Sequence, residues 1–208
     1  MSVNAAAVRA MSAPKHDAIL DAAKRVFLRE GYSASMDLVS AEAGVSKQTV
    51  YNHFASKEAL FRAIVDDLAS ELLDVLVERV SMRADPACTL EALARRFLNL
   101  LLMPSSLALH RMLVAEAPRF PDLARQIYLG GPARAVDELA GYLEEQSRRG
   151  MLAVEDAPLA AEQFFGALRG NLQLRTLLDP RDLPGEAEVQ RALTHAVRSF
   201  LGAYAATG

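Results

Sequence analysis

Apolar residues recur at spacings of three and four along almost the whole chain, and this periodicity constrains the fold more than any other feature. Such a spacing places side chains on one face of an α-helix, and the strict alternation typical of half-buried strands is nearly absent from the sequence. Proline and glycine interrupt the pattern at intervals, and these residues mark helix ends. The sequence therefore predicts an all-α fold.

The interruptions also indicate how the chain is organised. We expect a disordered arm over residues 1–13, a small helical domain over 14–60 and a larger helical domain over 61–208. A long helix beginning at Ser56 is shared by both domains, and on it Leu60, Ile64, Leu68, Leu72 and Leu76 form one apolar stripe. The remaining helices are expected at residues 16–29, 35–43, 46–54, 87–103, 105–117, 121–129, 132–149, 157–178 and 186–205.

Composition limits the cellular setting but not the function. The 208 residues are 51% hydrophobic and carry a net charge of −3, which does not by itself point to nucleic acid. Cys88 is the only cysteine, so no internal disulfide can form and a reducing compartment is expected. The first residues lack the apolar core of a signal peptide, and the charge-free stretch 97–110 is too short to span a membrane. We therefore expect a cytoplasmic protein without membrane contact.

The segment from Ser35 to Phe54 has the features of a helix-turn-helix. Its turn needs a residue that tolerates unusual backbone angles, which Gly44 supplies, and the contact between its helices needs a small residue, which Ser40 supplies. Apolar side chains for the helix crossing are available at Leu38 or Val39, Val45 and Val50. The segment therefore predicts two short helices that cross steeply over residues 35–54.

The second of these helices has a polar outer face. Its side chains are hydrogen-bond donors and acceptors of the kind that contact phosphate oxygens and base edges, namely Lys47, Gln48, Thr49, Tyr51, Asn52 and His53. A solvated helix without a partner would more usually carry Glu and Lys four residues apart. The pattern therefore favours a helix that reads DNA.

Two runs of sequence resemble the TetR family of bacterial transcriptional regulators. GVSKQTVYNHFASKEAL, residues 44–60, is similar to the family's recognition helix and its aromatic end, and ILDAAKRVFLREGY, residues 19–32, is similar to its first helix. The connection after Gly31 is one residue shorter than usual, which leaves either Ser33 or Ser35 as the cap of the next helix. The resemblance implies a dimer that binds double-stranded DNA.

The resemblance also implies a role for each residue of the DNA-reading unit. Phosphate contacts are expected from Ser46, Lys47, Tyr51, His53 and Lys57, with Ser35 beside them, and base contacts from Gln48, Thr49 and either Tyr51 or Asn52. Three alternatives stay open: Tyr51 as a packing residue, His53 as a solvated helix end and Thr49 as a merely exposed residue. We expect Phe54 to belong to the core.

The rest of the chain is similar to the C-terminal domain of the AefR-like repressors, a TetR subgroup. The similarity lies in LVAEAPRFPDLARQIY, GGPARAVDELAGYL and AAEQFFGALRGNLQLRTLL, which begin at Leu113, Gly130 and Ala160. It implies dimerisation through the last two long helices, with candidate interface residues Phe165, Gly166, Gly170, Leu193, Val197 and Phe200. The alternative is that these faces complete the core of one subunit.

The same similarity implies a small-molecule effector. Polar side chains within apolar helices are the natural orienting groups of such a pocket, and the candidates are His110, Arg111, Glu116, Gln163, Arg169 and Asn171. Each could instead lie at the surface or in an intersubunit ion pair. With only 6% aromatic residues and no tryptophan, aliphatic contacts to a lipophilic compound are favoured.

The expected function is a dimeric repressor that binds an inverted-repeat operator and is released by its effector. An activator, or a helical body that docks a partner protein, is an open alternative. The sequence has no Gly-rich phosphate loop, no metal-ligand spacing and no nucleophile elbow, and its four histidines are scattered. We therefore expect no enzyme activity, no cofactor and no metal.

Overall fold

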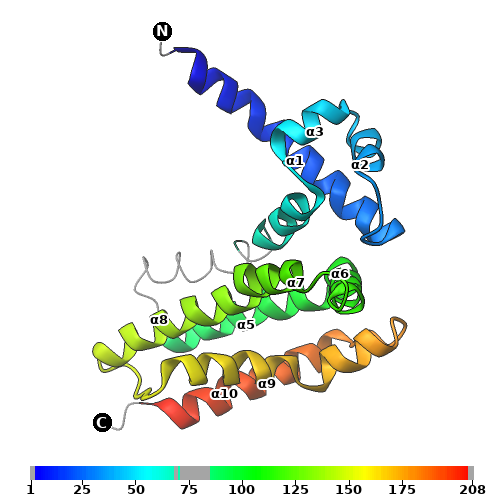
Figure 1. Ribbon diagram of the computed structural model, residues 1–208. Coiled ribbons are helices and arrows are strands. Elements are labelled where there is room, and N and C mark those ends of the chain that lie inside the picture. Colours follow the sequence, from blue (N-terminus) through cyan, green and yellow to red (C-terminus); the bar gives the residue numbers. More distant parts are fainter. Residues whose placement is uncertain (1–2, 68–69, 71–84, 206–208) are drawn as a thin grey trace. The chain divides into compact units, whose positions relative to one another are not determined.

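The computed structural model describes residues 3–67, 70 and 85–205, with side chains from residue 15 onward. The chain divides into two compact units (Figure 1). The first comprises Met1–Asp66 and Ala108–Gln126, and the second comprises Asp67–Leu107 and Ile127–Gly208. All named elements are helices, and Leu152 and Ala205 form an isolated antiparallel bridge. The predicted all-α fold is confirmed.

The first unit is built on three helices, α1 (Val3–Glu30), α2 (Met36–Ala43) and α3 (Lys47–His53). Helix α2 packs against both α1 and α3. A further helix is described over residues 57–67, and α6 (Pro104–Glu116) and α7 (Pro121–Tyr128) contribute residues 108–126. The core of this unit is formed by fully buried side chains, among them Ile19, Val26, Phe27, Val39, Val50, Leu60, Phe61 and Ile64.

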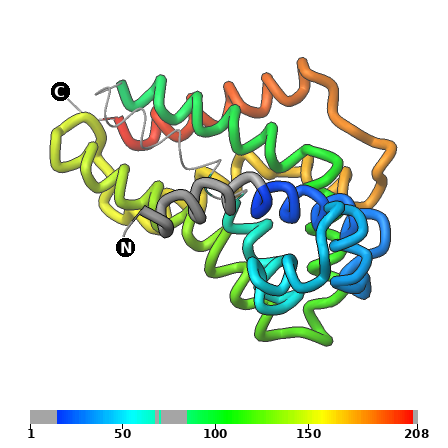
Figure 2. The backbone as a smooth tube through the Cα atoms, turned by 90° about the horizontal axis from the view of Figure 1, so that it is seen from above, coloured from blue at the N-terminus to red at the C-terminus, as the bar shows by residue number. Residues whose placement is uncertain are grey.

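The second unit contains α5 (Pro86–Leu102), η1 (Leu129–Ala133), α8 (Arg134–Arg148), α9 (Ala157–Leu178) and α10 (Glu186–Tyr204). Helix α9 contacts α5, α8 and α10, and α10 also contacts α5 (Figures 1 and 2). One apolar cluster fills the space between these four helices. It includes Leu90, Leu93, Phe97, Leu139, Leu143, Phe164, Phe165 and Phe200.

Helix bounds agree closely with the sequence prediction, but two differences concern organisation. Helix α1 begins at Val3, where a disordered arm through residue 13 was expected, because the alanines of this stretch have the highest helix propensity of any residue. Residues 108–126 belong to the first unit, whereas the sequence analysis placed all of 61–208 in one domain. The cause is packing, since the ring of Phe120 lies 5.2 Å from that of Tyr32.

The apolar stripe predicted for the helix after Ser56 is described only at its start. Leu60 and Ile64 are buried as expected, and Leu68, Leu72 and Leu76 lie outside the described residues. The Gly130-Gly131-Pro132 segment was expected to separate two helices. It forms the π-helical turn η1 instead, and this wider turn carries the chain from α7 into α8 with Pro132 inside it.

Gly170 interrupts the regular geometry of α9. Its backbone angles are φ 41° and ψ −140°, which kink the helix and which a residue with a Cβ rarely adopts. Beyond the kink, the guanidinium of Arg175 donates two hydrogen bonds of 2.7 Å to Glu188 and lies 3.1 Å from Asp182. These hydrogen bonds raise the pKa of Arg175 and lower that of Glu188. The pairing therefore holds α9, the connecting segment and α10 together.

No single helix in the described part of the chain is long and apolar enough to cross a membrane. Helices α5 and α6 are long and apolar enough only when they are taken together, and the chain bends by 66° at the break between them. Helix α5 packs one face into the core of the second unit, with Leu90, Leu93, Phe97 and Leu98 buried.

The helix-turn-helix glycine gives a direct test of the fold. Gly44 has φ 66°, and no atom lies within 4 Å of where a Cβ would be, so Gly44→Ala changes backbone strain alone. We expect it to lower the free energy of unfolding by about 1–2 kcal/mol, measured by urea denaturation. The matched control is Gly141→Ala in α8, also in open space, which should raise stability by about 0.5–1 kcal/mol. Equal effects of the two substitutions would contradict the assignment.

Candidate nucleic-acid interface

The turn between α2 and α3 is held by backbone geometry and two caps. Ser35 caps α2 by accepting a hydrogen bond from the Leu38 N–H, which resolves the choice between Ser33 and Ser35. Gly44 ends α2 in the left-handed conformation, and Ser46 caps α3 by accepting from the Thr49 N–H at 3.1 Å. These local bonds fix where both helices begin and end.

The crossing of the two helices is apolar, as the sequence predicts. Val39 and Val50 are fully buried, Ser40 is buried, and its hydroxyl donates to the carbonyl of Asp37 at 2.8 Å. Leu38 is exposed, so Val39 is the residue that faces inward. Phe54, directly after the last residue of α3, is buried as expected. Buried side chains from both helices therefore hold α3 against α2.

The outer face of α3 brings the predicted DNA-reading residues together. Lys47, Gln48, Tyr51 and Asn52 are exposed, and Tyr51 has 41% of its surface accessible, so it can contact a ligand while part of its ring is still covered, and both interpretations of Tyr51 stay open. The Gln48 amide donates to the Asn52 side chain at 3.0 Å. Thr49 is half-buried and its hydroxyl is hydrogen-bonded to that of Ser46 at 2.8 Å. His53 is half-buried, with its ring 6.1 Å from that of His16.

Lys47 is paired with Asp37 in the free protein. The ammonium lies 2.8 Å from a carboxylate oxygen of Asp37, and this hydrogen bond raises the pKa of Lys47. Asp37 is in the first turn of α2, where the helix dipole stabilises a negative charge. A phosphate at this position would have to compete with the aspartate for the same ammonium group.

Lys57 lies beside Tyr32 at the start of the next helix. Its ammonium donates to the Tyr32 carbonyl at 2.8 Å and lies 4.5 Å above the centre of the tyrosine ring. Burial raises the pKa of Tyr32, and its hydroxyl donates to Glu58 at 3.3 Å. Ser56 caps the helix that carries Lys57 by accepting from the Ala59 N–H at 3.1 Å. Lys57 is thus held at a helix N-terminus, which favours phosphate.

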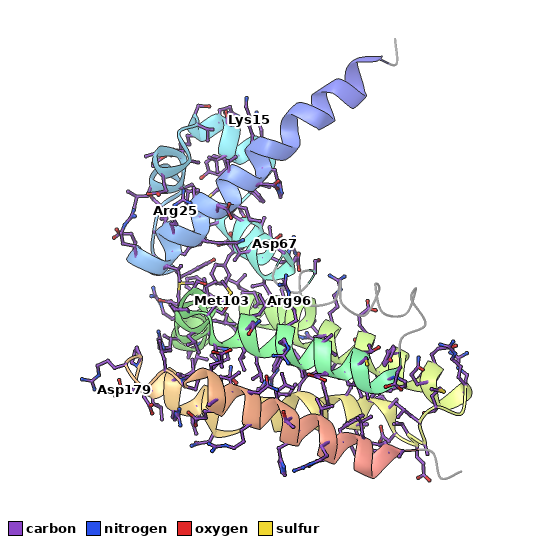
Figure 3. All side chains as sticks on the ribbon, turned by 180° about the vertical axis from the view of Figure 1, so that it is seen from behind. Lys15, Arg25, Asp67, Arg96, Met103 and Asp179 are labelled. Carbon is purple, nitrogen blue, oxygen red and sulfur yellow. The ribbon has the colours of Figure 1, made fainter. Side chains whose placement is uncertain are left out.

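Two ion pairs join α1 to α2. Arg25, which is labelled in Figure 3, reaches Glu42 at 2.9 Å. Arg29 reaches the same carboxylate at 3.4 Å. Hydrogen bonds from the two arginines lower the pKa of Glu42. All three side chains are partly or largely exposed, so we expect each pair to contribute little to stability. Their effect is to reduce the free positive charge of the first unit.

The candidate effector residues are divided between the two units. His110, Arg111 and Glu116 are on α6 in the first unit, and Gln163, Arg169 and Asn171 are on α9 in the second. His110, Gln163 and Asn171 are exposed. The Glu116 carboxylate lies 3.3 Å from the Arg119 guanidinium. The Gln163 amide oxygen accepts a hydrogen bond from the Tyr204 hydroxyl at 3.4 Å. Arg169 differs from the others because its Nε atom is buried and lacks a hydrogen-bond partner among the described residues.

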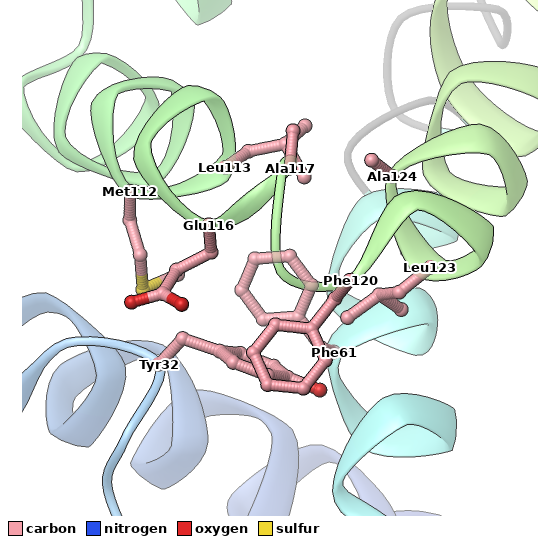
Figure 4. Close-up of a pocket in the computed structure, with 9 residues that line it drawn as sticks. All are labelled: Tyr32, Phe61, Met112, Leu113, Glu116, Ala117, Phe120, Leu123 and Ala124. Carbon is pink, nitrogen blue, oxygen red and sulfur yellow. The ribbon is translucent and has the colours of Figure 1, made fainter.

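Glu116 lines a small hollow in the first unit, beneath the α6–α7 connection. Figure 4 shows Met112 and Glu116 projecting from α6, with the rings of Tyr32, Phe61 and Phe120 beside them. The hollow offers about 10 Å³ to a water-sized molecule. That volume is enough for one water at most, so the hollow does not hold an effector in this form.

The candidate dimer residues divide into two groups. Phe165, Leu193, Val197 and Phe200 are buried in the core of their own subunit, as the alternative interpretation of these faces proposed. They are buried because α5, α8, α9 and α10 enclose a single apolar cluster. Gly166 and Gly170 are exposed, with open space where a Cβ would lie.

Sequence reasoning missed the aromatic contacts around Tyr32. The Tyr32 ring lies 5.5 Å from that of Phe61 and 5.2 Å from that of Phe120, and Phe27 lies 5.6 Å from Phe61. Tyr32 was included in the TetR resemblance, and this is the only signal that singled it out. In the parts of the chain that the structure describes, no group of three or more His, Cys, Asp or Glu side chains could hold a metal ion.

Two family models match this chain and together cover most of it. Residues 19–64 match the N-terminal domain of the bacterial regulatory proteins of the tetR family. Residues 88–206, more than half of the chain, match the C-terminal domain of the AefR-like transcriptional repressors. Both matches agree with the resemblances found in the sequence.

Individual proteins match over nearly the full length. A TetR-family regulator structure from Mesorhizobium loti superposes with a TM-score of 0.80 at 32% identity, covering 93% of this chain and 98% of that one. The flavonoid-responsive regulator FrrA has a TM-score of 0.69 at 31% identity, covering 94% and 100%. The HTH-type transcriptional regulatory protein RaaS of Mycobacterium tuberculosis is 27% identical over 179 residues, 85% of this chain and 79% of that protein. The chain belongs to the TetR family of transcriptional regulators, with a C-terminal domain of the AefR-like type.

Proposed function

We propose that this regulator is a dimeric repressor that binds an inverted-repeat operator and leaves it when a small lipophilic molecule binds. The observation that carries the DNA-binding part is the exposed polar face of α3, held by the Ser46 cap and the buried Val50. Gln48 can pair bidentately with adenine in the major groove, whereas Lys47 and Lys57 are suited to phosphates on either side. No catalytic role is proposed.

The proposed dimer joins the outer faces of α9 and α10 from two subunits. An open groove of about 910 Å³ runs along α10 past Ala187, Arg191 and His195, and an adjoining hollow of about 450 Å³ lies at Ala167 and Gly170 of α9. Small residues there allow helices to approach closely, and Leu174 and Leu178 on α9 are exposed. Four helices packed in this way form a common dimer interface.

The proposed effector is lipophilic because the described interior of the second unit is apolar and aromatic. FrrA, which is similar to this chain over nearly its full length, is described as flavonoid-responsive, which places a small organic ligand among its regulators. Effector binding would shift the population toward a form with weaker operator affinity, a coupling of about 1–3 kcal/mol in typical cases.

Dimerisation and operator symmetry are tested together. We expect footprinting to show protection with dyad symmetry, with half-sites about 34–36 Å apart or a multiple of that distance.

Ala167→Arg places a bulky charge in the proposed interface, where the side chain is exposed in the single subunit. It should therefore produce monomers in analytical ultracentrifugation and lower operator affinity at least tenfold. The control, Gly141→Arg on the exposed face of α8, should remain dimeric. A monomeric wild type with full affinity would overturn the proposal.

The reading residues are tested by their different effects on affinity and sequence preference. Gln48→Ala should change the preferred base at one position by about 1–3 kcal/mol and leave non-specific binding nearly unchanged. Tyr51→Ala and Lys57→Ala should weaken binding to all sequences, because they remove phosphate contacts, and Lys57→Ala should reduce the salt dependence by about 0.9 per half-site. Fluorescence anisotropy over a salt series measures both effects. Arg125→Ala, an exposed cation on α7, is the control, and equal losses from all the variants would contradict the assignment.

The Lys47–Asp37 pair leads to a prediction of tighter binding. Asp37→Asn removes the carboxylate that competes with phosphate for Lys47, so non-specific affinity at low salt should rise about two- to fivefold, the size of an exposed ion pair. Asp122→Asn is a matched control, because Asp122 is also an exposed first-turn aspartate, in α7. A similar gain from Asp122→Asn would show that only net charge had changed.

A further inference from the structure

Among the residues that the structure describes, Arg169 on α9 is a cation without a counter-charge. Within that part of the chain its buried Nε atom has no hydrogen-bond partner, and no carboxylate forms an ion pair with its guanidinium. Six residues further along the same helix, Arg175 also has a buried Nε atom without a hydrogen-bond partner, but its two terminal nitrogens donate to Glu188 and its Nε lies 3.1 Å from Asp182. Of these two arginines of α9, Arg175 is therefore paired with carboxylates and Arg169 is not.

The surroundings of Arg169 are aromatic. Its guanidinium carbon lies 5.6 Å from the centre of the Phe97 ring on α5, and Phe97 itself packs 4.8 Å from Phe165, one turn before Arg169 on α9. Burial lowers the pKa of Arg169, and Tyr128 at the end of α7 acts on it electrostatically in the opposite direction. Arginine does not lose its proton in proteins, so the cost of this burial stays with the charged form.

An unpaired, partly buried cation lowers stability unless something else compensates it. The ring of Phe97 compensates in part through a cation–π contact, but a ring face satisfies no N–H group. The guanidinium is a planar fork that matches a carboxylate with two parallel hydrogen bonds. Tyr128, which acts electrostatically on this guanidinium, and Leu129, which follows Tyr128 in the chain, each expose more than half of their surface and offer apolar area to a ligand.

We propose that Arg169 anchors the carboxylate of a lipophilic monoanion, with Tyr128 and Leu129 against its apolar body and Phe97 holding the guanidinium in place. One guanidinium neutralises one negative charge, so a monoanion fits this site better than a phosphate dianion. This inference rests on the proposed function in one respect, namely that the second unit binds an effector. It adds the chemical class of the ligand and the residue that recognises it.

The test compares charged and neutral molecules of matched shape on the full-length protein. The probes are decanoate with 1-decanol, and 4-butylbenzoate with 4-butylbenzyl alcohol, followed by thermal shift and calorimetric titration. We expect at least one carboxylate to raise the Tm of the wild type and its alcohol to bind at least tenfold more weakly, because a charged hydrogen-bonded pair is lost. No shift with either carboxylate, or equal binding of acid and alcohol, overturns the proposal.

Variants of Arg169 separate recognition from folding. Arg169→Met should weaken carboxylate binding about tenfold or more, and Arg169→Lys should keep part of it. The control is Arg149→Met, an exposed arginine at the far end of α8 from Tyr128, which should bind like the wild type. Without ligand, Arg169→Met should have an equal or higher Tm, since an unpaired charge is removed. A Tm lower by several degrees would show that Arg169 has a partner within the chain and would overturn the proposal.

Operator release is measured separately, so the two proposals can fail independently. If carboxylates bind through Arg169 and the operator stays bound, effector release is wrong and the carboxylate site stands. If a neutral lipophile releases the operator from both wild type and Arg169→Met, the repressor mechanism stands and the carboxylate site is wrong.

Discussion

The packing of Phe120 against Tyr32 is the interaction on which the rest of the first unit depends. Tyr32 follows α1, and its ring also contacts Phe27 and Phe61, so one side chain connects α1, the helix at 57–67 and the α6–α7 connection. Edge-to-face ring pairs such as Tyr32–Phe61 and Tyr32–Phe120 contribute about 0.5–1.5 kcal/mol each beyond the area they bury. The Tyr32 carbonyl and ring also position Lys57, so the same residue supports both the packing and a phosphate-binding candidate.

This packing bears on how the proposed effector response would reach the first unit. Helix α6 begins in the second unit and ends in the first, and α7 begins in the first and ends in the second, at Tyr128. The two helices are therefore covalent connections between the ligand-binding candidates and the reading unit. Because Phe120 lies between α6 and α7 and packs on Tyr32, a shift of either helix would act on the support of Lys57. Coupling of this kind needs two arrangements of one packed element, and in the proposed response to an effector the aromatic contacts around Tyr32 would be that element.

Much of this architecture could be predicted from sequence because it is determined locally. Gly44, Ser46 and the prolines at the starts of α5, α6 and α7 act on their immediate neighbours, so the helix bounds and the helix-turn-helix follow from residue type. The membership of residues 108–126 in the first unit could not be predicted, because the Tyr32–Phe120 contact joins residues far apart in sequence. For Phe165, Leu193, Val197 and Phe200, an apolar stripe shows only that a face is buried. Whether the covering surface belongs to the same subunit or to another is not encoded in the periodicity.

The electrostatics of the reading unit explain why a net charge of −3 is compatible with DNA binding. Arg25 and Arg29 share Glu42, Lys47 is paired with Asp37, and Lys57 is bonded to a carbonyl, so phosphate binding exchanges existing partners for new ones. Each exchange contributes less binding free energy than an unpaired cation would. We therefore expect a single α3 helix with its neighbouring lysines to bind DNA weakly. In the proposed dimer, the second of the two α3 helices would bind with a high effective concentration, because its contact with DNA becomes intramolecular. Tight operator binding by this protein would therefore come from the two paired helices rather than from the charge of either one.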